Sequence, residues 1–343
     1  MTPARALALT VHALVALGLA ACASSAGSTA APSPTTGASP VLPTMTPEAT
    51  IAVPEPGWFT SDGTALWLLT ATGKIGRLDP TTNSLGTLAV VDATHKDGGF
   101  AASPRGVWLA DFDTDLLYRM DPASLKVVAR IRVGTNPEGV AVDPRSGAVW
   151  VANHRGGSVD RVDPATDRVV ASVKVGSTGP SGPHQVTVGL GSVWVGVPNA
   201  SRYYRIDPRT NTVAAMIDVP LGGAPCGGFA FSKVAVWTPS CRETTNLVRI
   251  DPVANKAVAV VELGGYGSDP VLVQGFPWLV VESLSDGPGR LVRVSPTTNK
   301  VDRVFSFGDG FKGGGLTVLD GSVWLTDWAN STIMRLPLAA FAP

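Results

Sequence analysis

The chain contains 343 residues with 27 basic and 27 acidic side chains, so its formal net charge is zero. Such a balance lacks the broad positive field by which proteins bind nucleic acids, and we expect no nucleic-acid role. With 38 Gly, 28 Pro and 44% apolar residues, the composition is typical of short strands and many turns around an ample core.

Residues 1–22 have the features of an export signal. Arg5 precedes an apolar stretch, and residues 19–22 (LAAC) resemble the bacterial lipobox. We therefore predict that Cys22 is lipidated and becomes the mature N-terminus, which makes the protein an extracytoplasmic lipoprotein anchored to a bacterial membrane. The alternative is an ordinary signal peptide cut after a small-x-small site. A retained transmembrane helix is disfavoured, because the apolar stretch is too short for a comfortable span.

Residues 23–48 consist almost entirely of Ala, Ser, Thr, Pro and Gly. This composition cannot bury enough apolar surface to offset the entropy of ordering. We predict a disordered tether between the anchor and a folded domain that covers residues 49–343.

Residues 139–176 show the unit from which the folded domain is built. They contain four runs of alternating apolar residues, 139–142, 148–152, 158–162 and 169–175, separated by turn sequences. Period-two alternation interrupted by Asp-Pro and Gly-Gly predicts four antiparallel strands joined by tight turns. One such sheet cannot bury both faces alone, so it needs neighbours of the same kind.

The unit recurs seven times. A Trp marks the second run of each copy, at intervals of 41 to 46 residues: Trp67, Trp108, Trp150, Trp194, Trp237, Trp278 and Trp324. An Arg precedes the turn after each third run: Arg77, Arg119, Arg161, Arg205, Arg249, Arg293 and Arg335. Four-stranded repeats of this length predict an all-β fold, a β-propeller with seven blades of four antiparallel strands.

The two ends of the repeat region complement each other. The seventh unit stops after its third run, residues 331–338, and residues 50–54 (TIAVP) precede the first unit. These N-terminal residues match a fourth strand elsewhere in the chain, residues 216–220 (MIDVP). We predict that the N-terminal strand completes the last blade and removes its exposed edge.

The combination VWVAN, RVDP and VVASVKVG resembles YVTN-type propeller repeats and, more distantly, streptogramin B lyases. The resemblance covers residues 49–338 and implies a propeller fold. The lyase resemblance further implies histidines from adjacent units at the channel mouth, with a nearby glutamate and a magnesium ion. This chain places His184 at one such position, but Gly227 and Pro198 stand where the second His and the Glu are expected.

Ligands of propellers usually enter where the loops after strands two and four surround the central channel. We name this end the mouth rim and the opposite end the turn rim. The residue before strand one should face the mouth in each unit, and seven positions align there: Gly57, Gly98, Glu138, His184, Gly227, Asp269 and Gly314. Three of them can bind a metal ion or move a proton, namely Glu138, His184 and Asp269.

A second set of mouth candidates follows each marker Trp by three or four residues. It supplies the further ligand-binding candidates Asp111, Asn153, Glu282, Asp327 and Trp328. Loop Asp and Asn often only satisfy turn backbone, and we interpret His154 as a solvated loop residue. Glu282 shares a unit with Asp269, so a carboxylate pair could hold Mg²⁺ or Ca²⁺ at the mouth. We otherwise expect no cofactor.

Cys226 and Cys241 both fall at the mouth rim of the fifth unit. An exported protein meets an oxidising compartment, so we predict a disulfide between them. Two free thiols or a metal site are the alternatives.

The repeated Trp and Arg are interpreted as structural. We expect each Trp to fill the space between adjacent blades. Each Arg should lay its stem over the blade and, in the five copies where an Asp stands two residues further on, reach that Asp on the same face of the strand.

Two functions fit these features. The first is a monomeric binding or scaffolding module that takes a small ligand or a protein partner at the channel mouth. The second is a metal-assisted lyase or hydrolase that uses His184, Glu138 and either Asp269 or Glu282. Convergence of these side chains would favour catalysis, and separation into different loops would favour binding.

Overall fold

The computed structural model describes residues 42–91, 99–284, 287–308 and 310–342. Leu42–Pro343 form one compact unit. The predicted signal segment, Cys22 and most of the predicted tether lie outside the described residues. Within the described part of the chain, no helix has the length and apolar character needed to cross a membrane.

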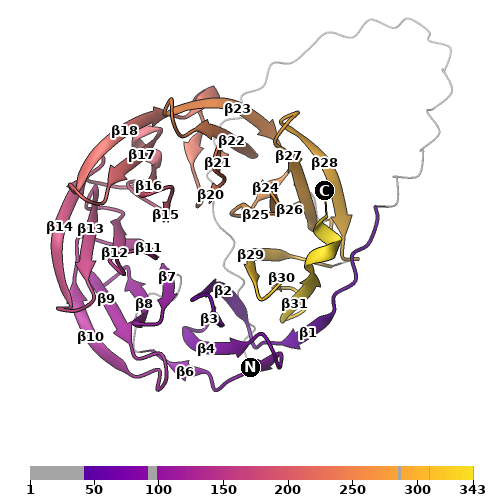
Figure 1. The fold of residues 1–343 in the computed structure, drawn as a ribbon, viewed down its shortest axis with the longest axis horizontal. Coiled ribbons are helices and arrows are strands. Elements are labelled where there is room, and N and C mark those ends of the chain that lie inside the picture. Colours follow the sequence, from indigo (N-terminus) through magenta and orange to yellow (C-terminus); the bar gives the residue numbers. More distant parts are fainter. Residues whose placement is uncertain (1–41, 92–98, 285–286, 309, 343) are drawn as a thin grey trace, which may run out of the picture. The chain divides into compact units, whose positions relative to one another are not determined.

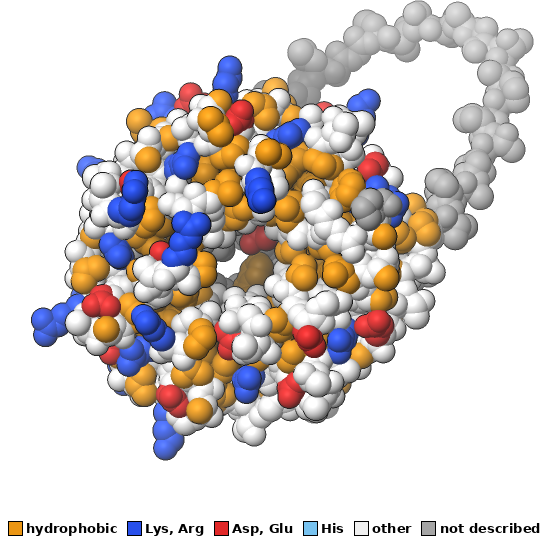
Figure 2. Space-filling view, in the orientation of Figure 1, with side chains coloured by type: hydrophobic (Ala, Val, Ile, Leu, Met, Phe, Trp, Pro, Cys, Tyr) orange, Lys and Arg blue, Asp and Glu red, His pale blue; other side chains and the backbone are white. Residues whose placement is uncertain are grey.

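Seven antiparallel sheets follow one another around a central channel, which confirms the seven-bladed propeller (Figure 1). Figure 2 shows the channel as an opening at the centre of the ring, with an acidic side chain inside it. In blades 1 to 6 the strands follow chain order from the channel outward. Each blade therefore places its first strand at the channel and its fourth at the outer surface.

Blades 1 and 2 contain β2 (Pro56–Ser61), β3 (Leu66–Thr70), β4 (Lys74–Asp79), β5 (Ser84–Leu85), β6 (Ala89–Val90), β7 (Phe100–Ser103), β8 (Gly106–Asp111), β9 (Leu116–Met120) and β10 (Val127–Arg132). Blades 3 and 4 contain β11 (Pro137–Val142), β12 (Val149–Asn153), β13 (Ser158–Asp163), β14 (Arg168–Lys174), β15 (Val186–Gly189), β16 (Ser192–Val197), β17 (Arg202–Asp207) and β18 (Thr212–Asp218).

Blades 5 and 6 contain β19 (Ala224–Pro225), β20 (Ala230–Phe231), β21 (Val236–Cys241), β22 (Thr245–Asp251), β23 (Lys256–Glu262), β24 (Tyr266–Gly267), β25 (Val271–Val273), β26 (Phe276–Glu282), β27 (Arg290–Ser295) and β28 (Lys300–Ser306). Blade 7 contains β29 (Gly313–Leu319), β30 (Ser322–Asp327), β31 (Thr332–Pro337) and β1 (Ala49–Ala52). Three short 3-10 helices are η1 (Pro198–Ala200), η2 (Pro220–Gly222) and η3 (Leu338–Phe341).

The innermost strand of blades 5 and 6 is broken into two pieces. In blade 5 both β19 and β20 pair with β21, and in blade 6 both β24 and β25 pair with β26. Cys226 lies in the first break and Asp269 in the second. Each break frees backbone groups at the channel that a continuous strand would use in its ladder.

The seven marker Trp side chains form the core between the blades. All are at most 1% exposed. Each belongs to a separate apolar cluster that also contains strands of the next blade; Trp150, for example, packs with Val193 and Val195. The last cluster joins Trp324 of blade 7 to Leu66 and Leu68 of blade 1, so the ring closes through its core.

The seven repeated Arg side chains make contacts that differ from those expected from the sequence. Each guanidinium lies 5.3 to 5.9 Å from the centre of its marker Trp ring. Several then donate to the turn of the next blade: Arg205 binds Pro252 O at 2.8 Å and Asn255 Oδ1 at 3.0 Å. Arg161, Arg249 and Arg335 repeat this pattern.

The Asp of each Asp-Pro turn serves a different purpose from the expected pairing with Arg. Asp251 Oδ1 accepts the backbone N–H groups of Val253 and Ala254, and Asp79 does the same for its own turn. The expected same-face pairing of Arg and Asp is therefore wrong. The guanidinium reaches across the blade boundary, and the carboxylate accepts backbone N–H groups of its own turn.

The N-terminal strand closes the last blade as predicted. β1 pairs antiparallel with β31, with Ile51 opposite Ile333 and Ala52 opposite Thr332. Before it, Met45 is buried in the cluster that contains Phe341 of η3, and Thr44 bridges to Ser306 of β28. Residues near both ends of the described propeller are thus packed against blades 6 and 7.

Candidate functional site

The aligned mouth positions occupy equivalent places in the structure. In blades 1, 3 and 7 the residue four after the marker Trp donates its N–H to a carbonyl just before strand one of the same blade. These bonds join Ala71 to Glu55 (2.9 Å), His154 to Asn136 (2.8 Å) and Trp328 to Lys312 (2.7 Å). The two predicted sets of candidates therefore share one rim. Gly98 lies outside the described residues.

A carboxylate between two imidazoles forms the centre of the site. Glu138, in β11 of blade 3, has Oε2 2.8 Å from His154 Nδ1 and Oε1 2.9 Å from His184 Nε2. His154 follows β12 of the same blade, and His184 precedes β15 of blade 4. We refer to Glu138, His154 and His184 as the histidine cluster. It is partly buried, with 17 to 33% of each side chain exposed.

Each group of the cluster alters the charge state of its neighbour. Burial alone would raise the pKa of Glu138, but hydrogen bonds from His154 and His184 and their positive charge lower it to about 2. Burial alone would lower the pKa of His184, but the hydrogen bond and negative charge of Glu138 raise it above its ordinary value. Glu138 is therefore ionised at neutral pH and favours the protonated form of His184.

Backbone groups face both ring nitrogens of His154. The Ser181 N–H lies 3.2 Å from His154 Nε2. Pro183 O lies 3.3 Å from Nδ1, which also faces Glu138. The interpretation of His154 as a solvated loop residue was wrong, because Ser181 and Pro183 of the loop before β15, in the neighbouring blade 4, contact its imidazole.

One ring nitrogen of His184 has no hydrogen-bond partner among the described residues. Its Nε2 faces Glu138, whereas its Nδ1 is buried and has no hydrogen-bond partner among the described residues. A buried polar nitrogen without a partner is costly, so a ligand group that bonds to it would be stabilised. Such a group would be an acceptor when His184 is protonated, and a donor when it is neutral.

Asp269 approaches the cluster from blade 6. Its Oδ1 accepts the Gly228 N–H at 2.7 Å, across the boundary with blade 5, and its charge contributes to the raised pKa of His184. A Cβ at Gly227 would collide with Asp269 Oδ1, so this mouth position requires glycine. The surrounding walls raise the pKa of Asp269, although its side chain stays accessible to water.

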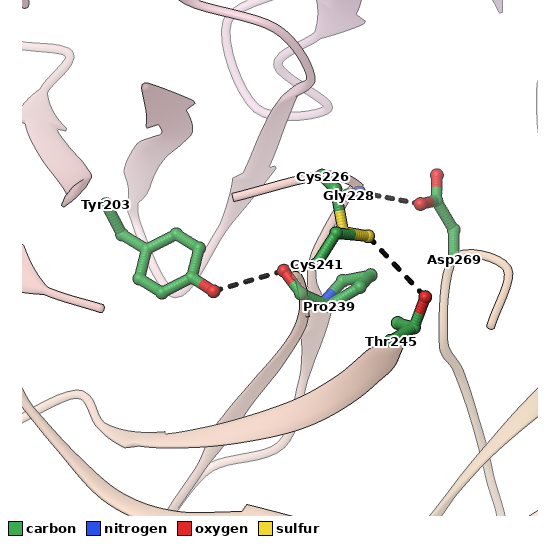
Figure 3. The surroundings of a disulfide bond; sticks show 7 residues. All are labelled: Tyr203, Cys226, Gly228, Pro239, Cys241, Thr245 and Asp269. Carbon is green, nitrogen blue, oxygen red and sulfur yellow. Dashed lines mark hydrogen bonds between the residues drawn. A yellow bond between two sulfur atoms is a disulfide. The ribbon is translucent and has the colours of Figure 1, made fainter. Parts of the chain in front are cut away.

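The predicted disulfide between Cys226 and Cys241 is present, and it holds the loop that carries Gly228 (Figure 3). Cys241 Sγ also lies 3.5 Å from Thr245 Oγ1 on β22. In addition, the Tyr203 hydroxyl of blade 4 donates to Pro239 O of blade 5 at 3.1 Å, and this bond links the two blades. The disulfide therefore fixes the backbone donor that positions Asp269.

Glu282 does not join Asp269. It lies opposite Tyr266 in the register of β24 and β26, while Asp269 turns toward Gly228 of the neighbouring blade. One of its carboxylate oxygens, Oε1, is buried without a hydrogen-bond partner among the described residues. Over the same residues, no group of three or more His, Cys, Asp or Glu side chains is arranged to hold a metal ion.

Three other candidates mainly support turns. Asp111 and Asn153 are fully buried at the ends of β8 and β12; Asp111 accepts the Asp113 N–H, and Asn153 donates to Ser158 Oγ. Asp327 accepts the backbone and side-chain N–H groups of Asn330. Trp328, by contrast, is 39% exposed on the mouth rim. It contacts Trp58, a residue that the sequence alignment did not select.

Comparison with known proteins adds likenesses of fold. No protein family model matches the chain, and none of the curated protein sequences matches it. The relationship to YVTN-type repeats therefore stays a prediction.

Among solved structures, a streptogramin B lyase is 16% identical, with a TM-score of 0.67 over 83% of this chain and 94% of that chain. A catalytically inactive histidine-to-alanine variant of virginiamycin B lyase from Staphylococcus aureus, solved with quinupristin, is 15% identical, with a TM-score of 0.67 over 82% and 94%. BamB from Moraxella catarrhalis is 13% identical, with a TM-score of 0.61 over 85% and 99%. At these identities the likeness concerns the propeller fold.

Proposed function

We propose that this protein is an extracytoplasmic lipoprotein whose propeller binds a ligand at the channel mouth without chemical turnover. The histidine cluster is the observation that carries the proposal. It keeps Glu138 ionised at neutral pH, which holds the His184 ring in place, and 33% of the His184 side chain stays exposed to a guest. The ligand is a small molecule or a segment of a protein partner that presents a carbonyl or carboxylate to protonated His184.

A rigid frame supports this site. Glu138 lies within β11, His154 is fixed by two backbone contacts, and Asp269 is positioned by a loop with a disulfide. Little ordering entropy remains to be lost on binding, which favours recognition. The likeness to BamB and to the lyases is consistent with a propeller used as a binding scaffold.

The mouth residues do not fit a ready-made metal centre. Both oxygens of Glu138 face imidazole nitrogens, and Asp269 and Glu282 lie apart. These residues as they stand therefore do not form a preorganised site for Mg²⁺ or Ca²⁺. Calorimetric titration with each chloride salt would reveal a site formed by rearrangement.

A second candidate function is that of a lyase or hydrolase, and the unpartnered nitrogen of His184 favours it. A carboxylate on one imidazole nitrogen orients the ring, and the other nitrogen of the neutral ring could remove a proton from a substrate. The two candidates differ in what happens to the bound molecule. Loss of quinupristin from a solution containing the purified protein, measured by chromatography, would establish the lyase.

Native mass spectrometry tests the binding proposal. The protein is incubated with an extract of the cell envelope, then desalted and measured intact. Wild type should retain a species that Glu138→Gln and His184→Ala release, and that is recovered with its mass unchanged. Arg145→Ala, on the turn rim, is the control and should retain the same species. Equal retention by all four proteins would contradict the proposal, and recovery of an altered molecule would indicate catalysis.

The proposed anchor requires its own test. Wild-type protein expressed in a bacterium should incorporate a fatty-acid label and sediment with membranes, and Cys22→Ser should do neither. A Cys22→Ser variant that still sediments with membranes would contradict the lipoprotein assignment.

A further inference from the structure

Two tryptophans lie outside the repeat positions. The chain has nine Trp, and the seven marker residues are buried. Trp58 in β2 and Trp328 after β30 remain 45% and 39% exposed. Their rings meet edge to face, with centroids 6.2 Å apart and planes at 79°. Large aromatic surface left in water at a rim is typical of a binding site.

Two glycines at the mouth rim, Gly57 and Gly314, position the Trp328 ring. A Cβ on Gly314 would collide with the six-membered ring of Trp328, so this ring needs glycine beneath it. Trp328 Nε1 donates to Gly57 O at 3.4 Å, which ties blade 7 to blade 1. The position of the ring is therefore set by the backbone of both blades rather than by chance exposure.

The two rings line a pocket of about 420 Å³ that also includes Glu55, Pro56 and Ser331. Glu55 is the one ionisable residue in this lining. The Glu55 backbone carbonyl accepts the Ala71 N–H, which fixes its place at the pocket edge. Among the described residues, the pocket is thus lined by two electron-rich aromatic rings and by Glu55, and by no Lys, Arg or His.

We propose that this pocket binds a small organic cation of the quaternary ammonium class. Aromatic faces attract cations through their quadrupole, most strongly for Trp, and a carboxylate adds a formal negative charge. The methyl groups of such a cation also match the apolar lining, which a hydrated metal ion would not. The pocket lies at the junction of blades 7 and 1, away from the histidine cluster of blades 3 and 4 (Figure 1). The inference is therefore a second subsite beyond the proposed function, and either can fail alone.

Saturation-transfer NMR on the methyl protons of choline tests the proposal, because it detects weak ligands directly. The neutral isostere 3,3-dimethylbutan-1-ol has the same shape without the charge. Choline should bind saturably, and at least about fivefold more tightly than the isostere, as expected for a cation–π contribution of about 1 kcal/mol. Both titrations are run in the same excess of sodium chloride, so that the charged and the neutral ligand are compared at equal ionic strength.

Three variants locate the site. Trp328→Leu should abolish the signal, Glu55→Gln should weaken binding, and Gly314→Ala should abolish it by displacing the Trp328 ring without altering any charge. Asp320→Asn, on the turn rim of blade 7, is the matched control and should bind as wild type. Melting temperatures check that each variant is folded.

Several outcomes would overturn the proposal. Equal affinity for choline and its isostere would mean that the pocket selects apolar shape, and binding unaffected by Glu55→Gln would exclude the carboxylate. Absence of a saturable signal, or a signal retained in folded Trp328→Leu, would exclude the site.

Discussion

At the scale of single residues, Glu138 determines the properties of the mouth. Its folded pKa of about 2 lies below the ordinary 4.5, so its ionised contacts stabilise the fold at higher pH and are lost as pH falls through that interval. The pKa of His184 is raised above 6.5, so its charged contacts stabilise the fold at lower pH and are lost as pH rises through the raised value. The two dependences have opposite sign and overlap in mildly acidic solution.

We predict that Glu138→Gln lowers the free energy of unfolding most between pH 4.5 and 6.5, by about 2 kcal/mol, the usual scale for hydrogen bonds to charged groups. The difference from wild type should shrink on either side of that range. NMR titration should also show the His184 pKa falling in the variant, because burial then acts without the carboxylate. An unchanged His184 pKa would contradict the arrangement.

One turn residue breaks the pattern of the inter-blade Arg contacts. Asn83, Asn211, Asn255 and Asn299 have φ between 51° and 56° and accept a hydrogen bond from the Arg of the preceding blade. Leu125 takes the equivalent position in blade 2, with φ of 55°. Leu pays a steric cost in this left-handed conformation that Asn largely avoids.

Leu125→Asn should therefore stabilise the protein, by about 0.5 to 1 kcal/mol in urea unfolding, because it relieves the backbone and supplies an acceptor for Arg77. The reverse change at an equivalent position, Asn299→Leu, should destabilise. A loss of stability in Leu125→Asn would show that the partial packing of Leu125 against its neighbours outweighs both gains.

At the scale of elements, β1 is the strand whose loss should matter most. It supplies the fourth strand of blade 7, and the adjacent Met45 and Val53 are 7% and 1% exposed. A chain that begins at residue 55 should melt on the order of 10 °C below one that begins at residue 42, as the loss of a few kcal/mol implies. A synthetic peptide of residues 42–54 should restore part of the difference. Equal melting temperatures would show that closure through the core suffices.

The disulfide makes a separate contribution. It joins residues 15 apart, and the chain-entropy model gives about 3 kcal/mol for a loop of this length. Reductant should lower the melting temperature of wild type to that of the Cys226→Ser/Cys241→Ser double variant, and should leave the variant unchanged. If wild type resists reductant while the double variant melts like it, the bridge contributes no stability.

At the scale of the whole molecule, the repeat made most of the fold predictable. Trp and Arg recur at positions that each blade needs for the same contact with its neighbour, so the blade number followed from their spacing. The closure by β1 followed from the missing fourth run of the last unit and from the match of residues 50–54 to residues 216–220. The breaks in the inner strands of blades 5 and 6 did not follow, because they depend on the fit of the Cys226 loop against Asp269.

The histidine cluster was predictable in part. The alignment already placed Glu138 and His184 at equivalent positions of adjacent blades, whereas His154 was assigned to the loop after the second strand of blade 3 and interpreted as solvated. The contact of His154 with the loop before β15 depends on how blades 3 and 4 are oriented relative to each other, and the sequence period does not specify that orientation. Trp58 left a simpler signal, since nine Trp in seven repeats leave two without a structural place.

The most direct test of the account is a crystal structure of the protein isolated from the cell envelope of its own host. We predict bound density at the channel mouth in contact with the His184 side chain. Density found only outside the mouth, with only water beside His184, would contradict the claim that the mouth is the binding site.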